Sequence, residues 1–497
     1  MTSFKHDDTS SDLSKVEHDA DVEMSAEDRR RLEKRLVRKV DLRMSYLIII
    51  YILNIIDRGN TPAARLRGFE RDLGLHGTQY STVLSILFVG YILMQIPSNM
   101  FMNYLGKPSI YLPVCTILWG VVSALTGIVQ NFGGAVACRF FLGFIEAAFL
   151  PGALFLLSKW YKRDELGLRV TILFCASFIS SAFGSVLAAG ILNDMQGKLG
   201  HAAWRWLFYI EGALTIFFAI FGFFILPDFP ETSLGWLTLA EKELAEKRML
   251  EEACLKKGDE NVVSPFQGFL QAITDWKVWW LSMIMALVQL SLSFMTFFPT
   301  LTATLGFDLM KTLLLCAPPW VLTTIGAFLL TRHSDATQER CWHTITPLVF
   351  GIIGSIIAMS TMNTAARYVS LSVTFHIYLQ TFSNFDLPFR FLMAQSPMGP
   401  AITIAWAVTS IQPANKCAVG IALINAFSQL GLVAGPYAWD KSWGPSYRKS
   451  FGICIAASAT SIIMSIIFRQ RLAALNRKAE EEEKSRGQTE PGYRYLL

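Results

Sequence analysis

Charged residues stand inside stretches of this sequence that are otherwise almost wholly apolar. Asp57 and Arg58 follow the run "LIIIYILNII", and Arg139 and Glu146 belong to "RFFLGFIEAAFLPG". An ionised side chain at the centre of a bilayer costs about 2.5–3.5 kcal/mol on insertion scales, so such a residue ordinarily faces a cavity and has a partner. Burial also strengthens the hold of a carboxyl group on its proton. Glu146 is therefore a candidate proton carrier.

The spacing of these residues predicts how each one meets its partner. Asp57 and Arg58 lie about 21 Å along a helix from the basic end of their stretch, in the outer third of a span. Neighbouring helical residues point about 100° apart, so the two need separate partners. Arg139 and Glu146 share one helix face with Gly143 between them, where another helix can approach closely. Arg139 has a simpler alternative role, which is to bond only to carbonyl groups of the first span or to Asp57.

The composition describes a membrane protein. Of the 497 residues 52% are apolar and only 17% are charged, and the mean hydropathy is +0.38. Apolar windows of about 20 residues can cross the hydrocarbon of a bilayer, and they must do so as helices. The alternation of a membrane barrel is absent from these windows. We predict twelve spans, at 44–63, 80–102, 109–129, 132–158, 168–192, 206–226, 277–304, 312–331, 344–362, about 388–409, 417–437 and 449–468.

These spans divide the chain into two six-helix halves, 41–226 and 276–468, with a charged central loop at 227–275 between them. The tails, 1–40 and 469–497, and the loop at 159–163 are rich in Lys and Arg, so both termini and the central loop are expected in the cytosol. Residues 1–24 are polar and are predicted to be disordered. The basic helix that follows either faces anionic lipid or serves as an ordinary positive-inside anchor.

Other functional classes lack their motifs. The eight cysteines show no metal-ligand spacing, and neither a phosphate-binding loop nor an H-E-x-x-H motif is present. We therefore expect no enzyme activity, no metal, no cofactor and no binding to nucleic acid. Polar residues in the second half can line a cavity or bond between helices, and these are Gln289, Gln395, Asn425 and Gln429.

Eight strings, in order from about 41 to 471, resemble the major facilitator superfamily and, within it, the fungal allantoate-permease-like branch of the anion:cation symporters. They are "DRGN", "FVGYILMQIPSN", "RFFLGFIEAAFLPG", "LSKWYKRDELGLR", "WRWLFYIEG", "LPDFPETS", "SDATQER" and "INAFSQLGLVAGPYAW". The resemblance implies two six-helix halves that rock about a central site. It also implies proton-coupled uptake of a small organic anion, such as a ureide, a vitamin carboxylate or another carboxylic acid.

The resemblance also assigns roles to residues. It implies that Arg58 or Arg139 offers a cation to the substrate carboxylate, with Asp57 or Glu146 neutralising it between cycles. Asn60 belongs to the same motif. A planar guanidinium suits a carboxylate because it can hold both oxygens. In the second half, Asp335 and Arg340 of "SDATQER" correspond to a cytosolic gate, whose counterpart in the first half is weakened here by Asn103 in the place of an acid.

Two features leave alternatives open. Residues 372–390 have no counterpart in the family; they form either an extracellular lid or, as we favour, a translated intron that the functional protein lacks. A second function for this fold is a non-transporting nutrient sensor, although the C-terminal tail is short for one. We expect a monomer in contact with membrane lipid, located in the plasma membrane. The sequence names neither the substrate nor the number of protons.

Overall fold

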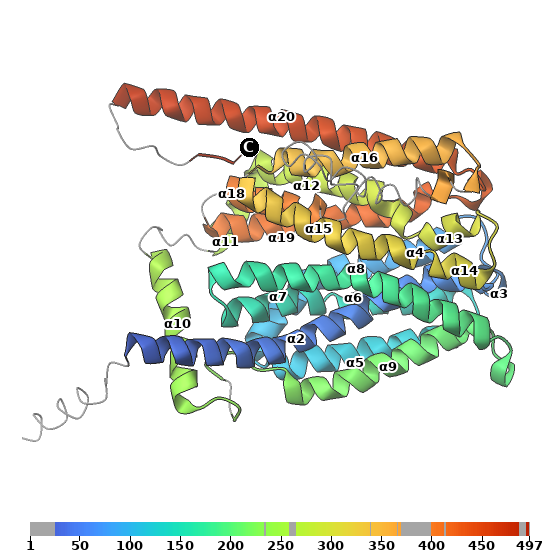
Figure 1. Ribbon diagram of the computed structural model, residues 1–497, viewed down its shortest axis with the longest axis horizontal. Coiled ribbons are helices and arrows are strands. Elements are labelled where there is room, and N and C mark those ends of the chain that lie inside the picture. The colour runs from blue at the N-terminus through green and yellow to red at the C-terminus, as the bar shows by residue number, and fades with distance from the viewer. Residues whose placement is uncertain are drawn as a thin grey trace, which may run out of the picture.

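The computed structural model describes residues 25–232, 235–257, 265–337, 339–364, 366–368, 399–411, 414–486 and 494–496. The predicted insert 372–390 and the first part of the span near 388–409 lie outside these residues. Figure 1 shows the helices up to α9 packed as one bundle and those from α12 onward as a second bundle beside it.

The first bundle consists of six spans. They are α2 (Ala26–Arg65), α4 (Gln79–Leu105), α5 (Pro108–Thr126), the broken pair α6 (Phe132–Glu146) and α7 (Phe149–Trp160), α8 (Arg163–Asp194) and α9 (Ala203–Ile225). A short helix, α3 (Phe69–Asp72), and a 3₁₀ turn, η1 (Lys198–Gly200), lie in the connections. The α6–α7 break has a local cause. Pro151 lacks an N–H, and its ring clashes with the carbonyl group four residues back, at Ala147.

The second bundle repeats this arrangement with more interruptions. Its helices are α12 (Trp276–Ser291), η2 (Leu292–Met295), α13 (Phe298–Ala303), α14 (Leu309–Leu314), α15 (Ala317–Thr337), α16 (Cys341–Ser360), α18 (Gly399–Ser410), α19 (Ala414–Ala434), η4 (Gly435–Ala438), η5 (Lys441–Trp443) and α20 (Arg448–Arg486). The central loop holds two helices, α10 (Leu239–Lys257) and α11 (Pro265–Thr274).

Ten of the described helical stretches are long and apolar enough to cross a membrane. α2 and α18 complete two sets of six. The apolar run of α2 is interrupted by Asn54, Asp57, Arg58 and Asn60, and α18 is described over only 12 residues. The predicted all-α fold with twelve spans in two halves is therefore confirmed. The predicted tail boundaries at 40 and 468 do not coincide with helix ends, because α2 and α20 continue through them.

The two halves are joined at the end of the bundle that carries α3 and η4. Ser81 Oγ donates to the carbonyl oxygen of Pro436 at 2.9 Å, and Ser85 Oγ donates to that of Val433 at 2.7 Å. Lys441 Nζ lies 3.2 Å from Glu70, so an ion pair also crosses between the halves. This is the end that charge distribution predicts to be extracellular. The halves are thus closed against each other on that side.

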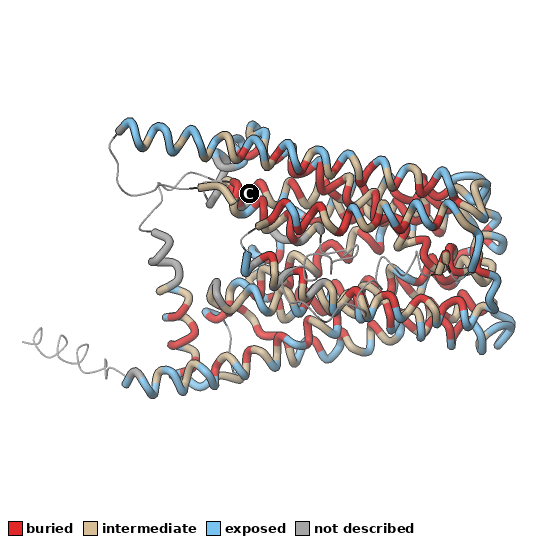
Figure 2. The backbone as a smooth tube through the Cα atoms, turned by 45° about the horizontal axis from the view of Figure 1, so that its top comes forward, coloured by how far each residue is buried: buried red, intermediate tan, exposed pale blue. Residues whose placement is uncertain are grey.

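The opposite end carries a structure that we call the α10 clasp, formed by Glu33, Glu165, Arg248, Lys39 and Glu241. The buried Arg248 guanidinium lies 2.7 Å from Glu33 on α2 and 2.6 Å from Glu165 on α8. Lys39 on α2 lies 2.7 Å from Glu241 on α10. The clasp holds α10 across the extended N-terminal part of α2, as Figures 1 and 2 show.

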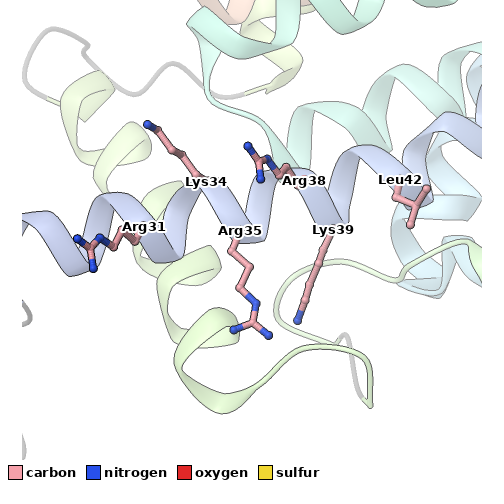
Figure 3. Close-up of a pocket in the computed structure, with 6 residues that line it drawn as sticks. All are labelled: Arg31, Lys34, Arg35, Arg38, Lys39 and Leu42. Atoms are coloured by element: carbon pink, nitrogen blue, oxygen red, sulfur yellow. The ribbon is translucent and has the colours of Figure 1, made fainter.

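Basic side chains continue along this part of α2. Figure 3 shows Arg31, Lys34, Arg35, Arg38 and Lys39 beside Leu42, with Arg35 and Lys39 on the side of α10. Burial alone raises the pKa of Glu241, but the Lys39 ammonium and the Thr238 hydrogen bonds outweigh it and hold that pKa below its usual value. The basic helix predicted from the sequence therefore binds the central loop as well as facing outward.

Candidate functional site

Asp57 and Arg58 on α2 have separate partners, as their 100° offset predicts. Ser123 Oγ on α5 donates to Asp57 Oδ1 at 2.8 Å, and Thr215 Oγ1 on α9 donates to Asp57 Oδ2 at 3.5 Å. Arg58 Nε instead donates to Glu146 Oε2 on α6 at 2.7 Å. The two residues thus face different sides of α2.

The Arg58 guanidinium contacts an aromatic ring and an acidic group, and its side chain is 26% exposed. It lies 5.0 Å from the centre of the Tyr91 ring on α4, a cation–π distance, while it pairs with the buried Glu146. Glu146 is the last residue of α6, immediately before the α6–α7 break, and its second oxygen, Oε1, has no hydrogen-bond partner among the described residues. One carboxylate oxygen is thus held by arginine, and the other makes no hydrogen bond although the Asn54 amide of α2 lies beside the carboxylate.

Arg139 lies two helical turns before Glu146 and is buried. Its Nε and Nη2 atoms have no hydrogen-bond partner among the described residues, and its guanidinium lies 5.6 Å from the Phe208 ring. An arginine is charged at all accessible pH values, so burying it without donors in use is costly. The proposed alternative, a purely structural Arg139 bonded to carbonyl groups or Asp57, would use these two nitrogens, and here they are unused.

The close approach predicted at Gly143 is present. A Cβ at this position would lie 1.9 Å from the carbonyl oxygen of Leu87 on α4. Gly90 makes the reciprocal approach, since a Cβ there would lie 2.3 Å from the carbonyl oxygen of Phe140. The two glycines bring the α4 and α6 backbones together beside Arg139, Glu146 and Tyr91.

One acidic residue of this cluster was missed in the sequence analysis. Glu211 on α9 is 2% exposed, and neither of its carboxylate oxygens has a hydrogen-bond partner among the described residues. Asn60 on α2 lies beside it, and the charge of Asp57 acts on it. The signal was present, because Glu211 is an acid inside the apolar string "WRWLFYIEGALTIFF". The cost of burying a charge in an apolar run applies to Glu211 as it does to Glu146.

The predicted second-half residues do not join this cluster through hydrogen bonds between described residues. Gln289 on α12 and Asn425 and Gln429 on α19 are half-buried, and α12 and α19 meet where a Cβ on Gly431 would lie 2.9 Å from Gln289 Cβ. Gln395 lies outside the described residues.

The predicted cytosolic gate is described in part. Arg340 Nη1 donates to Ser334 Oγ at 2.9 Å, and the neighbouring Glu339 lies 3.6 Å from Arg469 on α20. The side chain of Asp335 lies outside the described residues, so its pairing with Arg340 stays a prediction.

Known proteins resemble this chain over most of its length. Residues 47–436 match the Major Facilitator Superfamily. The MFS-type transporter cnsO of Penicillium expansum is 30% identical over 493 residues, covering 93% of this chain and 90% of that protein. A putative tartrate transporter of Agrobacterium vitis is 28% identical over 444 residues, covering 87% and 95%.

The fold has a solved counterpart. A bacterial homologue of the human lysosomal transporter Spinster, in an inward-facing and unoccupied conformation, superposes with a TM-score of 0.58 at 16% identity, covering 86% of this chain and 94% of the other. At that identity the likeness concerns the fold alone. The family match and the relatives of matching length establish that this chain belongs to the major facilitator superfamily and is a multi-pass membrane transporter.

Proposed function

We propose that this protein is a proton-coupled symporter of a small organic anion that carries a carboxylate, with the plasma membrane as its location. The observation that carries the proposal is the Arg58–Glu146 ion pair at 2.7 Å, next to the unpaired nitrogens of Arg139. The tartrate transporter named among the relatives supports a carboxylate substrate. The allantoate-permease-like branch, and thus ureides or vitamin carboxylates, is part of the same proposal.

The chemistry follows from competition for Arg58. In the empty site Glu146 is a carboxylate and occupies the guanidinium. A proton on Glu146 removes its charge, so the pair loses its Coulombic attraction and Arg58 becomes free to bind the substrate carboxylate. Arg139, with two donors unused, binds the second oxygen or a second carboxylate. Release of the proton on the other side restores the ion pair and expels the anion.

The remaining predicted residues complete the site in this proposal. Asp57 balances the charge of Arg139, and Asn60 provides an amide on the same helix. Gln289, Gln395, Asn425 and Gln429 supply polar groups from the second half, and Asp335 with Arg340 forms the cytosolic gate. No step requires a metal or a cofactor.

Transport into proteoliposomes tests the proposal. Purified protein is reconstituted, and uptake of ¹⁴C-tartrate, allantoate and a monocarboxylate is measured with an inward proton gradient and without one. The gradient is expected to raise uptake of at least one probe at least tenfold, and Glu146→Gln is expected to abolish that rise. Equal uptake with and without the gradient by the wild-type protein, for a probe that it does transport, would refute proton coupling.

A further inference from the structure

The charges clustered between α2, α6 and α9 do not balance when every group is ionised: Asp57, Arg139, Glu146 and Glu211 are buried, and the Arg58 side chain is 26% exposed. Two arginines, Arg58 and Arg139, face three carboxyl groups, Asp57, Glu146 and Glu211, and all five side chains lie within the first half. The guanidinium groups keep their charge. The empty site is therefore neutral only if one carboxyl group holds a proton.

The hydrogen bonds identify the carboxyl group that holds it. Glu146 receives a bond from Arg58, and Asp57 receives bonds from Ser123 and Thr215. Glu211 is 2% exposed, and the nearby Asn60 amide is the one donor beside it among the described residues, but this contact does not meet hydrogen-bond geometry and both Glu211 oxygens are left without a bond. A buried carboxylate without a donor carries the full cost of desolvation, whereas its neutral acid form does not.

Glu211 and Asp57 lie in one buried compartment. Thr215, which bonds Asp57, is four residues after Glu211 and so lies on the same face of α9. Asn60, three residues after Asp57, lies beside Glu211. Two carboxylates this close in a buried site oppose each other's ionisation.

Among the described residues, no positive group pairs directly with Glu211. From α2 the facing groups are Asp57 and Asn60, and α5 contributes Ser123 and carries no charged residue over its length. On α6, Arg139 and Glu146 act on Asp57 instead. The charged residues of α8 lie in its first two turns and its last turn, and Arg169 of the second turn pairs with Asp41 at 3.0 Å.

We propose that the Asp57–Glu211 pair is a second proton-binding site, which holds one resident proton on Glu211 throughout the transport cycle. Asp57 is then the lasting countercharge of Arg139, and Glu146 is the one carboxyl group that exchanges its proton. A bound monocarboxylate adds one negative charge and one proton restores neutrality, so the ratio of protons to anions is one. This ratio rests on the proposed function, whereas the resident proton does not.

Infrared spectroscopy of the purified protein tests the resident proton without any substrate. At pH 7 the wild-type protein is expected to show the carbonyl band of a buried carboxylic acid, and Glu211→Gln is expected to lose it. Glu246→Gln, on the surface of α10, is the matched control and should keep the band. An unchanged band in Glu211→Gln would overturn the proposal. Loss of the wild-type band when Na⁺ replaces K⁺ would also overturn it, because the pair would then bind Na⁺ in place of the resident proton.

Further variants guard against misfolding and separate the two proposals. If Glu211→Gln does not fold, Glu211→Asp should retain a carboxylic acid band at a shifted frequency, and its absence would count against the site. In proteoliposomes Glu211→Gln, which can still donate a hydrogen bond, should take up tartrate at least fivefold faster than Glu211→Ala. A Gln variant that exchanges tartrate but has lost proton-driven uptake would show that Glu211 gives up its proton, contrary to the proposal. Absence of proton-driven uptake in the wild type would refute the proposed function and leave the infrared result standing.

Discussion

Replacing Gly143 with alanine is expected to force α4 and α6 apart. The new Cβ would lie 1.9 Å from the carbonyl oxygen of Leu87 and 2.7 Å from its carbonyl carbon. Ordinary contact begins at 3.4 Å, so the helices must separate by about 1.5 Å (3.4 minus 1.9). The obstacle is backbone, and a change of rotamer does not relieve it.

The magnitude follows from two opposing effects. Overpacking of this kind costs about 1–3 kcal/mol, and the better helix propensity of alanine returns up to about 1 kcal/mol. Because the clash at 1.9 Å is with backbone, the cost lies at the upper end of that range, and the expected net loss is about 2 kcal/mol. The functional loss is larger, because Glu146 on α6 lies 2.7 Å from Arg58 on α2, and a shift of α6 by about 1.5 Å disturbs the geometry of that hydrogen bond.

Thermal stability and uptake measured on the same preparation test this prediction. Gly143→Ala should melt several degrees below the wild type and lose at least nine-tenths of its proton-driven tartrate uptake. Gly190→Ala on α8 is the matched control, since a Cβ there meets nothing within 4 Å. If both variants melted and transported alike, the close approach of α4 and α6 would not be what positions the site.

Three further predictions concern the arginines and the α10 clasp. Arg58→Lys keeps the charge but loses the planar fork, so the KM for tartrate should rise about tenfold while kcat changes less; an unchanged KM would argue against carboxylate binding there. Arg248→Met removes the buried cation between Glu33 and Glu165. Because both acids are partly exposed, the loss of stability should be about 1–2 kcal/mol. It should be seen as faster proteolysis of α10 than in an Arg31→Met control, since Arg31 pairs only within the exposed part of α2. The pKa of Glu241 is lowered in the folded protein, so the stability that Glu241 contributes is complete above the usual glutamate pKa and is lost as the pH falls through the lowered value. Spin labels at position 42 on α2 and position 250 on α10 should therefore move apart only in strong acid. A separation already present at pH 6 would contradict the lowered pKa.

The sequence was sufficient to predict the fold because lipid leaves few choices. Runs such as "LIIIYILNII" must be helices, and the charged central loop divides them into two sets of six. Helix breaks were harder to foresee. The interruption after Glu146 depends on Pro151, which stands inside an apolar run, so the predicted span 132–158 is continuous whereas the structure has a break.

Within the site, periodicity predicted directions but not partners. The 100° offset of Asp57 and Arg58 required separate partners, and the structure provides Ser123 with Thr215 for one and Glu146 for the other. Those partners lie on helices that are far from α2 in the sequence. Which of their residues meets Asp57 or Arg58 depends on how the helices pack against α2, and this packing cannot be read from a single sequence. Glu211 shows the reverse case, because an acid inside the apolar string "WRWLFYIEGALTIFF" is visible in the sequence alone.

The most direct test of the account is proton flux recorded during substrate entry. Proteoliposomes loaded with a pH-sensitive dye receive tartrate outside, with no initial pH gradient. If Glu146 carries the coupled proton, tartrate should acidify the lumen of wild-type vesicles, and Glu146→Gln should exchange tartrate without acidification. Acidification by Glu146→Gln at the wild-type rate, or tartrate accumulation by the wild type with a constant internal pH, would contradict it.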